Sequence, residues 1–129
     1  MIIRENKVNV EEYSEEFMIK PQGREYNPDE LIFFDLEHYV YKKPKCIGVF
    51  GACEYNHKKR QILVTQYMIE DKDEAVDILY LARNYFIRKK NEGKKAIVTF
   101  SGNNDFTVIN YLFNKNKIYY NFNEEFDSI

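Results

Sequence analysis

The sequence has no long apolar run and only two cysteines among its 129 residues. Its longest apolar runs are the length of a β-strand, far below the ~18–20 residues of a membrane helix. The N-terminus becomes charged at Arg4 and builds no signal-peptide apolar stretch. Cys46 and Cys53 have neither metal-ligand spacing nor the density of a disulfide scaffold. These absences predict a soluble intracellular protein, which we place in the cytoplasm without a membrane partner.

Other signatures are missing as well. The sequence contains no phosphate-cradling glycine-rich loop, no zinc-ligand spacing and no hydrolase nucleophile elbow. It has no excess of positive charge either, since 19 basic residues face 21 acidic ones and the formal net charge is −2. General nucleic-acid binders usually have a strongly basic domain. A nuclease is still compatible with this balance, because its acidic residues hold metal while a local group of lysines holds phosphates.

The length and composition are those of one globular domain, with 44% hydrophobic and 31% charged residues. Residues 1–30 are polar and contain Pro21 and Pro28, so we interpret them as an N-terminal extension with a helical piece at 10–19. Residues 31–129 form the predicted domain.

Hydrophobic periodicity predicts the order β-β-β-α-β-α-β within that domain. Short apolar or alternating runs predict strands, and apolar residues at three- and four-residue spacing predict helices. The expected strands span 31–37, 46–55, 61–68, 95–100 and 118–122, with a loop at 39–45; the expected helices span 71–90 and the region around 108–113. The fold class is α/β: a three-stranded antiparallel meander, a parallel strand added beside the first, and helices packed on the sheet.

The first predicted strand ends with two acids, Asp35 and Glu37, separated by one residue. Alternation along a strand puts both carboxylates on one face, about 7 Å apart. Like charges at this distance repel unless a cation lies between them, and Mg²⁺ prefers carboxylate oxygens. The pair therefore suits a metal site, although two acids at an exposed strand end are also explained by contact with water.

A third acid, Asp105, follows the fourth predicted strand. That strand should lie beside the first, so the three carboxylates should meet at one edge of the sheet, where ligands of open α/β sheets bind. An acid at this position is also favoured simply by the dipole of the helix that begins there. Asn103 and Asn104 suit the N-cap in either case.

Two segments make the chain resemble RNase H-like 3′–5′ exonucleases of the DEDD type, in their bacterial predicted-exonuclease branch. The first segment is Phe-Phe-Asp-Leu-Glu at 33–37, and the second is Val-Thr-Phe-Ser-Gly-Asn-Asn-Asp-Phe at 98–106. The resemblance covers roughly residues 30–129. In the family's second motif the aromatic residue precedes the acid, whereas here Asp105 precedes Phe106.

The resemblance implies a hydrolase that acts on phosphodiester bonds by a two-metal mechanism. Asp35, Glu37 and Asp105 would bind two Mg²⁺ or Mn²⁺ ions, and Asn103 or Asn104 would orient them by hydrogen bonding. The substrate would be an end of single-stranded DNA or RNA. No nucleophilic side chain is required.

The family continues into a helix that carries a Tyr or His and a final Asp, whereas this chain stops at Ile129. Asp127 is the late acid with an aromatic neighbour. We expect a domain short of its C-terminal element, with exposed apolar sheet surface and therefore a homodimer. The alternative function is a catalytically degenerate RNase H-like module for nucleic-acid binding or protein interaction.

Side chains near the acid pair are candidate contacts with nucleic acid. Lysines in the loop after Glu37 would lie near a substrate phosphate, and tyrosines there would stack on unpaired bases. The candidates are Lys42, Lys43, Lys45, Tyr39 and Tyr41. Contact with solvent explains the lysines equally simply, and packing explains the tyrosines. His38 follows Glu37 and should point to the opposite face, with a surface or supporting role.

Overall fold

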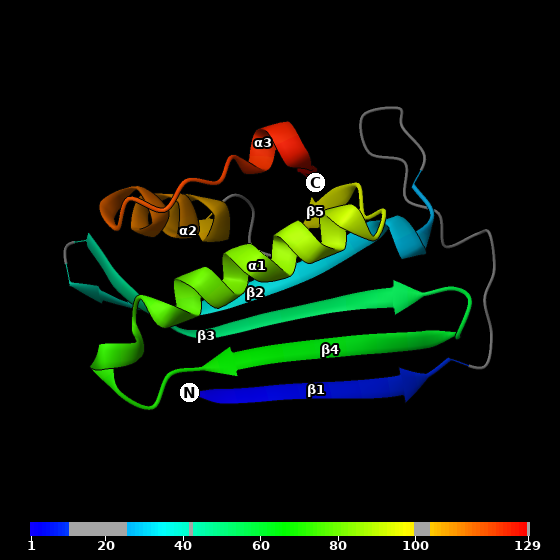
Figure 1. The fold of residues 1–129 in the computed structure, drawn as a ribbon, viewed down its shortest axis with the longest axis horizontal. Coiled ribbons are helices and arrows are strands. Elements are labelled where there is room, and N and C mark those ends of the chain that lie inside the picture. The colour runs from blue at the N-terminus through cyan, green and yellow to red at the C-terminus, as the bar shows by residue number, and fades with distance from the viewer. Residues whose placement is uncertain (11–25, 42, 100–103, 129) are drawn as a thin grey trace.

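The computed structural model describes residues 1–10, 26–41, 43–99 and 104–128. Six strands form one sheet in the order β1-β4-β3-β2-β5-β6, and three α-helices accompany it (Figure 1). The elements are β1 (Ile2–Asn9), β2 (Leu31–Tyr41), β3 (Lys43–Asn56), β4 (Gln61–Met68), α1 (Asp77–Asn91), β5 (Ala96–Val98), α2 (Asn104–Lys115), α3 (Phe122–Glu125) and β6 (Asp127–Ser128).

The sheet is mixed. β2, β3 and β4 form the antiparallel meander, and β5 adds parallel to β2. β6 then adds parallel to β5. This confirms the predicted α/β class, the meander and the position of the fourth predicted strand beside the first. Within the described residues, no helix is both long and apolar enough to span a bilayer.

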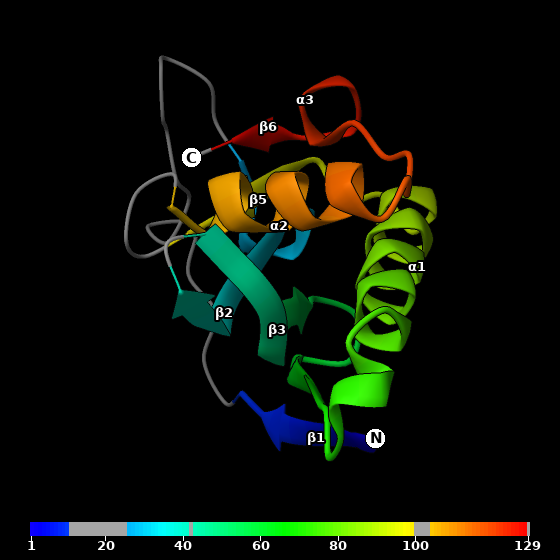
Figure 2. The ribbon, with the colours of Figure 1, turned by 90° about the vertical axis from the view of Figure 1, so that its left-hand side faces the viewer.

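All three α-helices pack on one face of the sheet (Figure 2). Even-numbered residues of β2, such as Phe34 and Leu36, point into a core that also contains residues of α1, α2 and α3. Phe33, Asp35 and Glu37 of β2 point to the other face, which we call the open face. The alternation is the strand period of two, and it separates the core from the acids of β2.

Phe86 of α1 lies at the centre of the core. Its ring centroid is 5.5 Å from that of Phe34, 5.7 Å from that of Phe50 and 5.0 Å from that of Phe122. The three pairs are edge-on, which suits the charge distribution of aromatic rings. Phe86 thereby joins the sheet, α1 and α3 in one packed unit.

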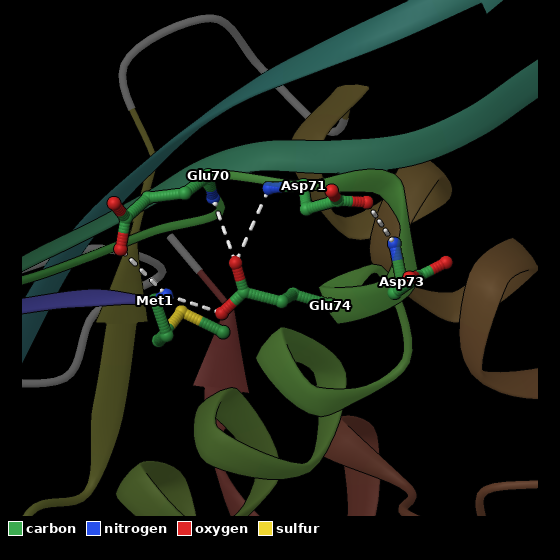
Figure 3. Close-up of polar contacts among 5 residues, drawn as sticks. All are labelled: Met1, Glu70, Asp71, Asp73 and Glu74. Atoms are coloured by element: carbon green, nitrogen blue, oxygen red, sulfur yellow. Dashed lines mark hydrogen bonds and ion pairs between the residues drawn. The ribbon is translucent and has the colours of Figure 1, made fainter.

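A capping box precedes α1. Asp71 accepts a hydrogen bond from the Asp73 amide, and Glu74 accepts one from the Asp71 amide, as the spacing of these acids predicts (Figure 3). The box opens a 3₁₀ turn at Lys72–Glu74, and α1 begins after it. The N-terminal ammonium of Met1 contacts Glu70 and Glu74 (Figure 3). This ammonium lowers the pKa of Glu74.

β1 is a strand that the sequence did not lead us to expect. It pairs antiparallel with β4 from Ile2 to Asn9, so part of the predicted extension belongs to the sheet. Seven of its eight residues are exposed, which explains why no burial pattern marks it. The boundary at residue 30 stays a prediction, and the helical piece expected at 10–19 lies almost wholly outside the described residues.

Two other expectations were wrong. The loop expected at 39–45 is largely strand, because β2 and β3 continue as a hairpin in which Tyr41 pairs with Lys43. The strand expected at 118–122 is absent from that position. There Ile118 and Phe122 are buried around the exposed Tyr119, and Asn121 caps α3 by accepting a hydrogen bond from the Asn123 amide. The last strand is β6 instead.

Truncation of the central ring tests this core. We expect Phe86→Ala to lower the free energy of unfolding by about 3–5 kcal/mol, because it removes a fully buried ring and leaves a cavity. Tyr119→Ala is the control, since Tyr119 is 86% exposed, and it should change stability by less than ~0.5 kcal/mol. Urea unfolding followed by circular dichroism measures both. Equal losses would contradict this description of the core.

Candidate functional site

The candidate site lies where β2 runs past the end of β5. β5 pairs with β2 only from Leu31 to Phe33, so the next residues of β2 face the start of α2 rather than a strand. A backbone N–H here needs another partner. The Leu36 amide donates to Oδ1 of Asp35 at 3.0 Å. Because β5 is short, side chains can approach β2 beyond Phe33, where β5 no longer pairs with it.

Asp35 and Glu37 are both exposed and alternate with the buried Phe34 and Leu36. In the register with β3, Asp35 lies opposite Gly51 and Glu37 opposite Val49. The two acids thus share the open face, as the sequence predicts. Glu37 also borders a hollow that Val49 and Met68 line, away from the edge.

Asp105 is placed differently, in the first turn of α2. Its side chain is almost completely buried, with 3% exposure, and its Oδ2 has no hydrogen-bond partner among the described residues. The carboxyl group interacts with that of Asp35. Burial, followed by the negative charge of Asp35, raises the pKa of Asp105 to about 6. The predicted approach of Asp105 to the first acid motif is therefore present in the fold.

His38 contributes to the same electrostatics. The alternation of β2 puts it on the helix-covered face, and its partner in β3 is the buried Ile47, across an irregularity of register. Its electrostatic interaction with Asp105 lowers the pKa of that carboxyl in part. From the sequence we expected only a surface or supporting role for His38. His38 shares a face of β2 with Phe34, and α2 packs against Phe34 through Phe106. This shared face could have indicated that His38 lies near Asp105.

The Asp35–Asp105 pair suits a hard divalent cation. Two carboxylates at neutral pH repel each other, and a cation between them would relieve that repulsion and satisfy the unpaired Oδ2. Mg²⁺ commonly takes one or two protein carboxylates and keeps several waters. In the part of the chain that the structure describes, no group of three or more Asp, Glu, His or Cys side chains is gathered for a metal. The role of Glu37 as a ligand stays a prediction.

The remaining candidates are only partly visible. Asn103 and Lys42 lie outside the described residues, and Asn104 is described only as the first residue of α2. Four others occupy backbone positions on the β2–β3 hairpin beyond Glu37, and their side chains are not described: Tyr39, Tyr41, Lys43 and Lys45. Asp127 lies elsewhere, in β6 opposite Ala96, and accepts a hydrogen bond from Tyr26.

The meander, the parallel β5 and the acids at their edge define a mixed α/β domain with a carboxylate site beside its first core strand. A family model described as the RNase H superfamily matches residues 32–129. The chain therefore belongs to the RNase H superfamily, and β1 precedes the matched region. A search of curated proteins and a search of solved structures each found no match.

The raised pKa of Asp105 predicts a pH-dependent stability. An acid whose pKa is higher in the folded state stabilises that state below its unfolded pKa, near 4, and loses this contribution as the pH rises through about 6. Asp105→Asn removes the buried charge, so it should raise the free energy of unfolding at pH 7.5 by on the order of 1–3 kcal/mol and have little effect at pH 4.

Thermal unfolding at the two pH values, without divalent metal, measures the difference. Glu5→Gln is the matched control, because it removes an exposed acid from β1. A stabilisation by Asp105→Asn that is equal at pH 4 and pH 7.5 would show that the buried charge is not its cause.

Proposed function

We propose that the protein is a metal-dependent exonuclease that hydrolyses single-stranded nucleic acid from the 3′ end. The observation that carries the proposal is the buried Asp105 beside Asp35 at a sheet edge, in a chain of the RNase H superfamily. Membership of this superfamily favours a hydrolase-like domain that acts on nucleic acid. The preference for single strands and the direction of digestion are the finer parts of the proposal.

The acids have distinct tasks in this proposal. Asp35 and Asp105 hold Mg²⁺ or Mn²⁺ at the edge, and Glu37 supplies a further carboxylate from the open face. Two such ions, when bound, supply an activated water and a charge that stabilises the leaving oxygen. Asp105 retains its negative charge near neutral pH more readily with a cation beside it, because the cation offsets the effect of Asp35.

The surroundings of Asp35 suit a nucleotide. A shallow hollow of about 190 Å³ lies beside it on the open face, and its lining is largely apolar. Phe33 and Val64 border this hollow, and Gly51 opposite Asp35 has no side chain to fill it. We assign it to a base or sugar of the strand. The hairpin residues Lys43 and Lys45 lie farther along the same strands, and we propose them as phosphate contacts.

A digestion assay tests the activity. With Mn²⁺ and an oligonucleotide labelled at its 5′ end, the wild type should give a ladder of shortening products, and chelation of the metal should stop the reaction. Asp35→Asn and Asp105→Asn should each lower the rate at least ~100-fold, since each removes a ligand from the metal centre. Glu5→Gln, on the exposed β1, is the control. If Asp35→Asn matches the wild type, the proposal is wrong.

A second candidate is the same fold without catalysis, as a module for nucleic-acid or protein binding. The absence of a group of three ligands among the described residues favours it. Calorimetry with Mn²⁺ separates the candidates. An exonuclease centre should bind two ions and lose them in Asp35→Asn, whereas a degenerate centre should bind weakly in both proteins.

The open face also supports the proposed homodimer. All three helices lie on the other face (Figure 2), and Val8 on β1, which pairs with Ile62 of β4, is 52% exposed. Met68 at the end of β4 is 40% exposed. Exposed apolar side chains that gather on one face suit an interface. We place the contact on the β1–β4 half of the face, which leaves Asp35 accessible.

Light scattering after gel filtration tests the dimer. At micromolar concentration the wild type should have twice the monomer mass, and Met68→Glu should shift it towards the monomer, because a charge would be buried in the contact. Ile87→Glu is the control on the outer side of α1, where Ile87 is equally exposed at 40%. A monomeric wild type would end this proposal.

A further inference from the structure

A second hollow lies at the other end of the sheet, on the helix-covered face. It is a cavity of about 420 Å³ between the C-terminal end of α1, the β3–β4 hairpin and β1. Cavities of this size hold small-molecule ligands. Five lysines line it: Lys7, Lys58, Lys59, Lys89 and Lys94. The cavity is therefore rich in positive charge within a chain whose net charge is −2.

Three acids also line the cavity, and two of them already have a partner. Glu54 is buried and accepts hydrogen bonds from Tyr85, at 2.8 Å, and contacts Lys89 at 3.0 Å. Glu92 contacts the same lysine at 3.0 Å. Lys89 is thus held by two carboxylates. The charges of Lys89, Glu54 and Glu92 therefore offset one another within the protein.

Lys94 is different. It is 6% exposed, and its Nζ donates to the carbonyl oxygens of Asp29, at 2.6 Å, and Tyr55, at 2.9 Å. An ammonium has three N–H donors, and the described residues supply acceptors for two. No carboxylate of the described residues forms an ion pair with it. A buried charge without an ion-pair partner is costly, and burial lowers the pKa of this lysine, an effect that the nearby carboxylates of Glu54 and Asp29 offset in part.

The two carbonyl contacts do not by themselves require a charge, because a neutral amide donor would satisfy both. What a lysine adds is a buried positive charge and a third donor at the wall of a cavity. Lys7, Lys58 and Lys59 add exposed positive charge at its rim. This arrangement suits an anion with several acceptor oxygens.

We propose that this cavity binds a phosphate group, with Lys94 as the buried donor and Lys7, Lys58 and Lys59 at the rim. The phosphate belongs either to a free nucleotide or to a nucleic-acid strand. The site is separate from the carboxylate pair. Glu54 at the cavity pairs with Ile32 near the start of β2, whereas Asp35 lies farther along β2 and faces the open side.

Nuclear magnetic resonance titration with inorganic phosphate, in a buffer with chelator and no other phosphate, tests the site. The wild type should show saturable shifts of the Lys94 amide and of the β3–β4 hairpin. Lys94→Met should weaken the affinity about tenfold or more, since a charge-assisted donor is lost. Lys95→Met is the matched control. Lys95, the neighbour of Lys94 in the sequence, is exposed, pairs with Glu30 at 2.6 Å and does not line the cavity. Its replacement should leave the affinity for phosphate unchanged.

Two outcomes of this titration overturn the proposal. The first is chemical shifts that do not saturate with phosphate, and the second is an equal affinity of Lys94→Met and Lys95→Met for phosphate. If the spectrum of Lys94→Met shows an unfolded chain, the double variant Lys7→Ala, Lys59→Ala carries the test, because both lysines are exposed. It should weaken phosphate binding at least about threefold, and an unchanged affinity counts against the site.

The source of the phosphate follows from two further titrations. Adenosine monophosphate that binds more tightly than phosphate, with an oligonucleotide no tighter, indicates a free nucleotide. A single-stranded oligonucleotide that binds more tightly, with shifts at the same residues, indicates a strand. Asp35→Asn should bind phosphate like the wild type. Failure of the phosphate site and failure of the nuclease proposal are therefore separate results.

Discussion

The parallel pairing of β5 with β2 is the contact on which the rest of the structure depends. It is only three residues long, yet it fixes the side of the sheet on which α1 crosses and the place where α2 begins. The right-handed crossover brings α1 onto the face that Phe34 and Phe50 occupy. Because β5 ends at Val98, α2 starts beside β2 and brings Asp105 to Asp35.

Two groups of charged side chains lie at opposite ends of β2, the strand that this pairing involves. Towards the C-terminal end of β2, acids gather at an edge, and one of them is buried with an unpaired oxygen. Towards the N-terminal end, α1 finishes and the buried Lys94 lies just before β5, in a cavity that three exposed lysines also line. A chain close to neutrality thus has a pair of acids at one end of β2 and a cavity with five lysines and three acids at the other.

The sequence predicted those elements whose burial has a regular period. The three meander strands, α1 and the neighbouring positions of Asp35 and Asp105 followed from alternation, from helical spacing and from the handedness of the crossover. β1 did not, because an edge strand with seven exposed residues has no apolar face to reveal it. At 118–122 the alternation of buried and exposed residues is real, but it belongs to a segment between α2 and α3 that pairs with no strand of the described residues.

Within the site, the limits of prediction have a different cause. The approach of Asp105 to Asp35 depends on topology, which the order of elements supplies, whereas its burial depends on how α2 is seated through Phe106 and Phe34. Lys94 follows closely after the C-terminal end of α1, where cations are favourable without being buried. Only the fold shows that it turns inwards to the carbonyl groups of Asp29 and Tyr55, which are distant in the sequence.

β1 has a consequence for the order of assembly. Its partner β4 begins at Gln61, and Met1 contacts Glu70 and Glu74, so each of these tertiary contacts closes a long loop. Loop closure costs entropy before any contact repays it. During synthesis β1 leaves the ribosome before β4 and must therefore wait for it. Until it docks, β4 is the outer strand of the sheet, with its backbone groups open to any extended chain nearby.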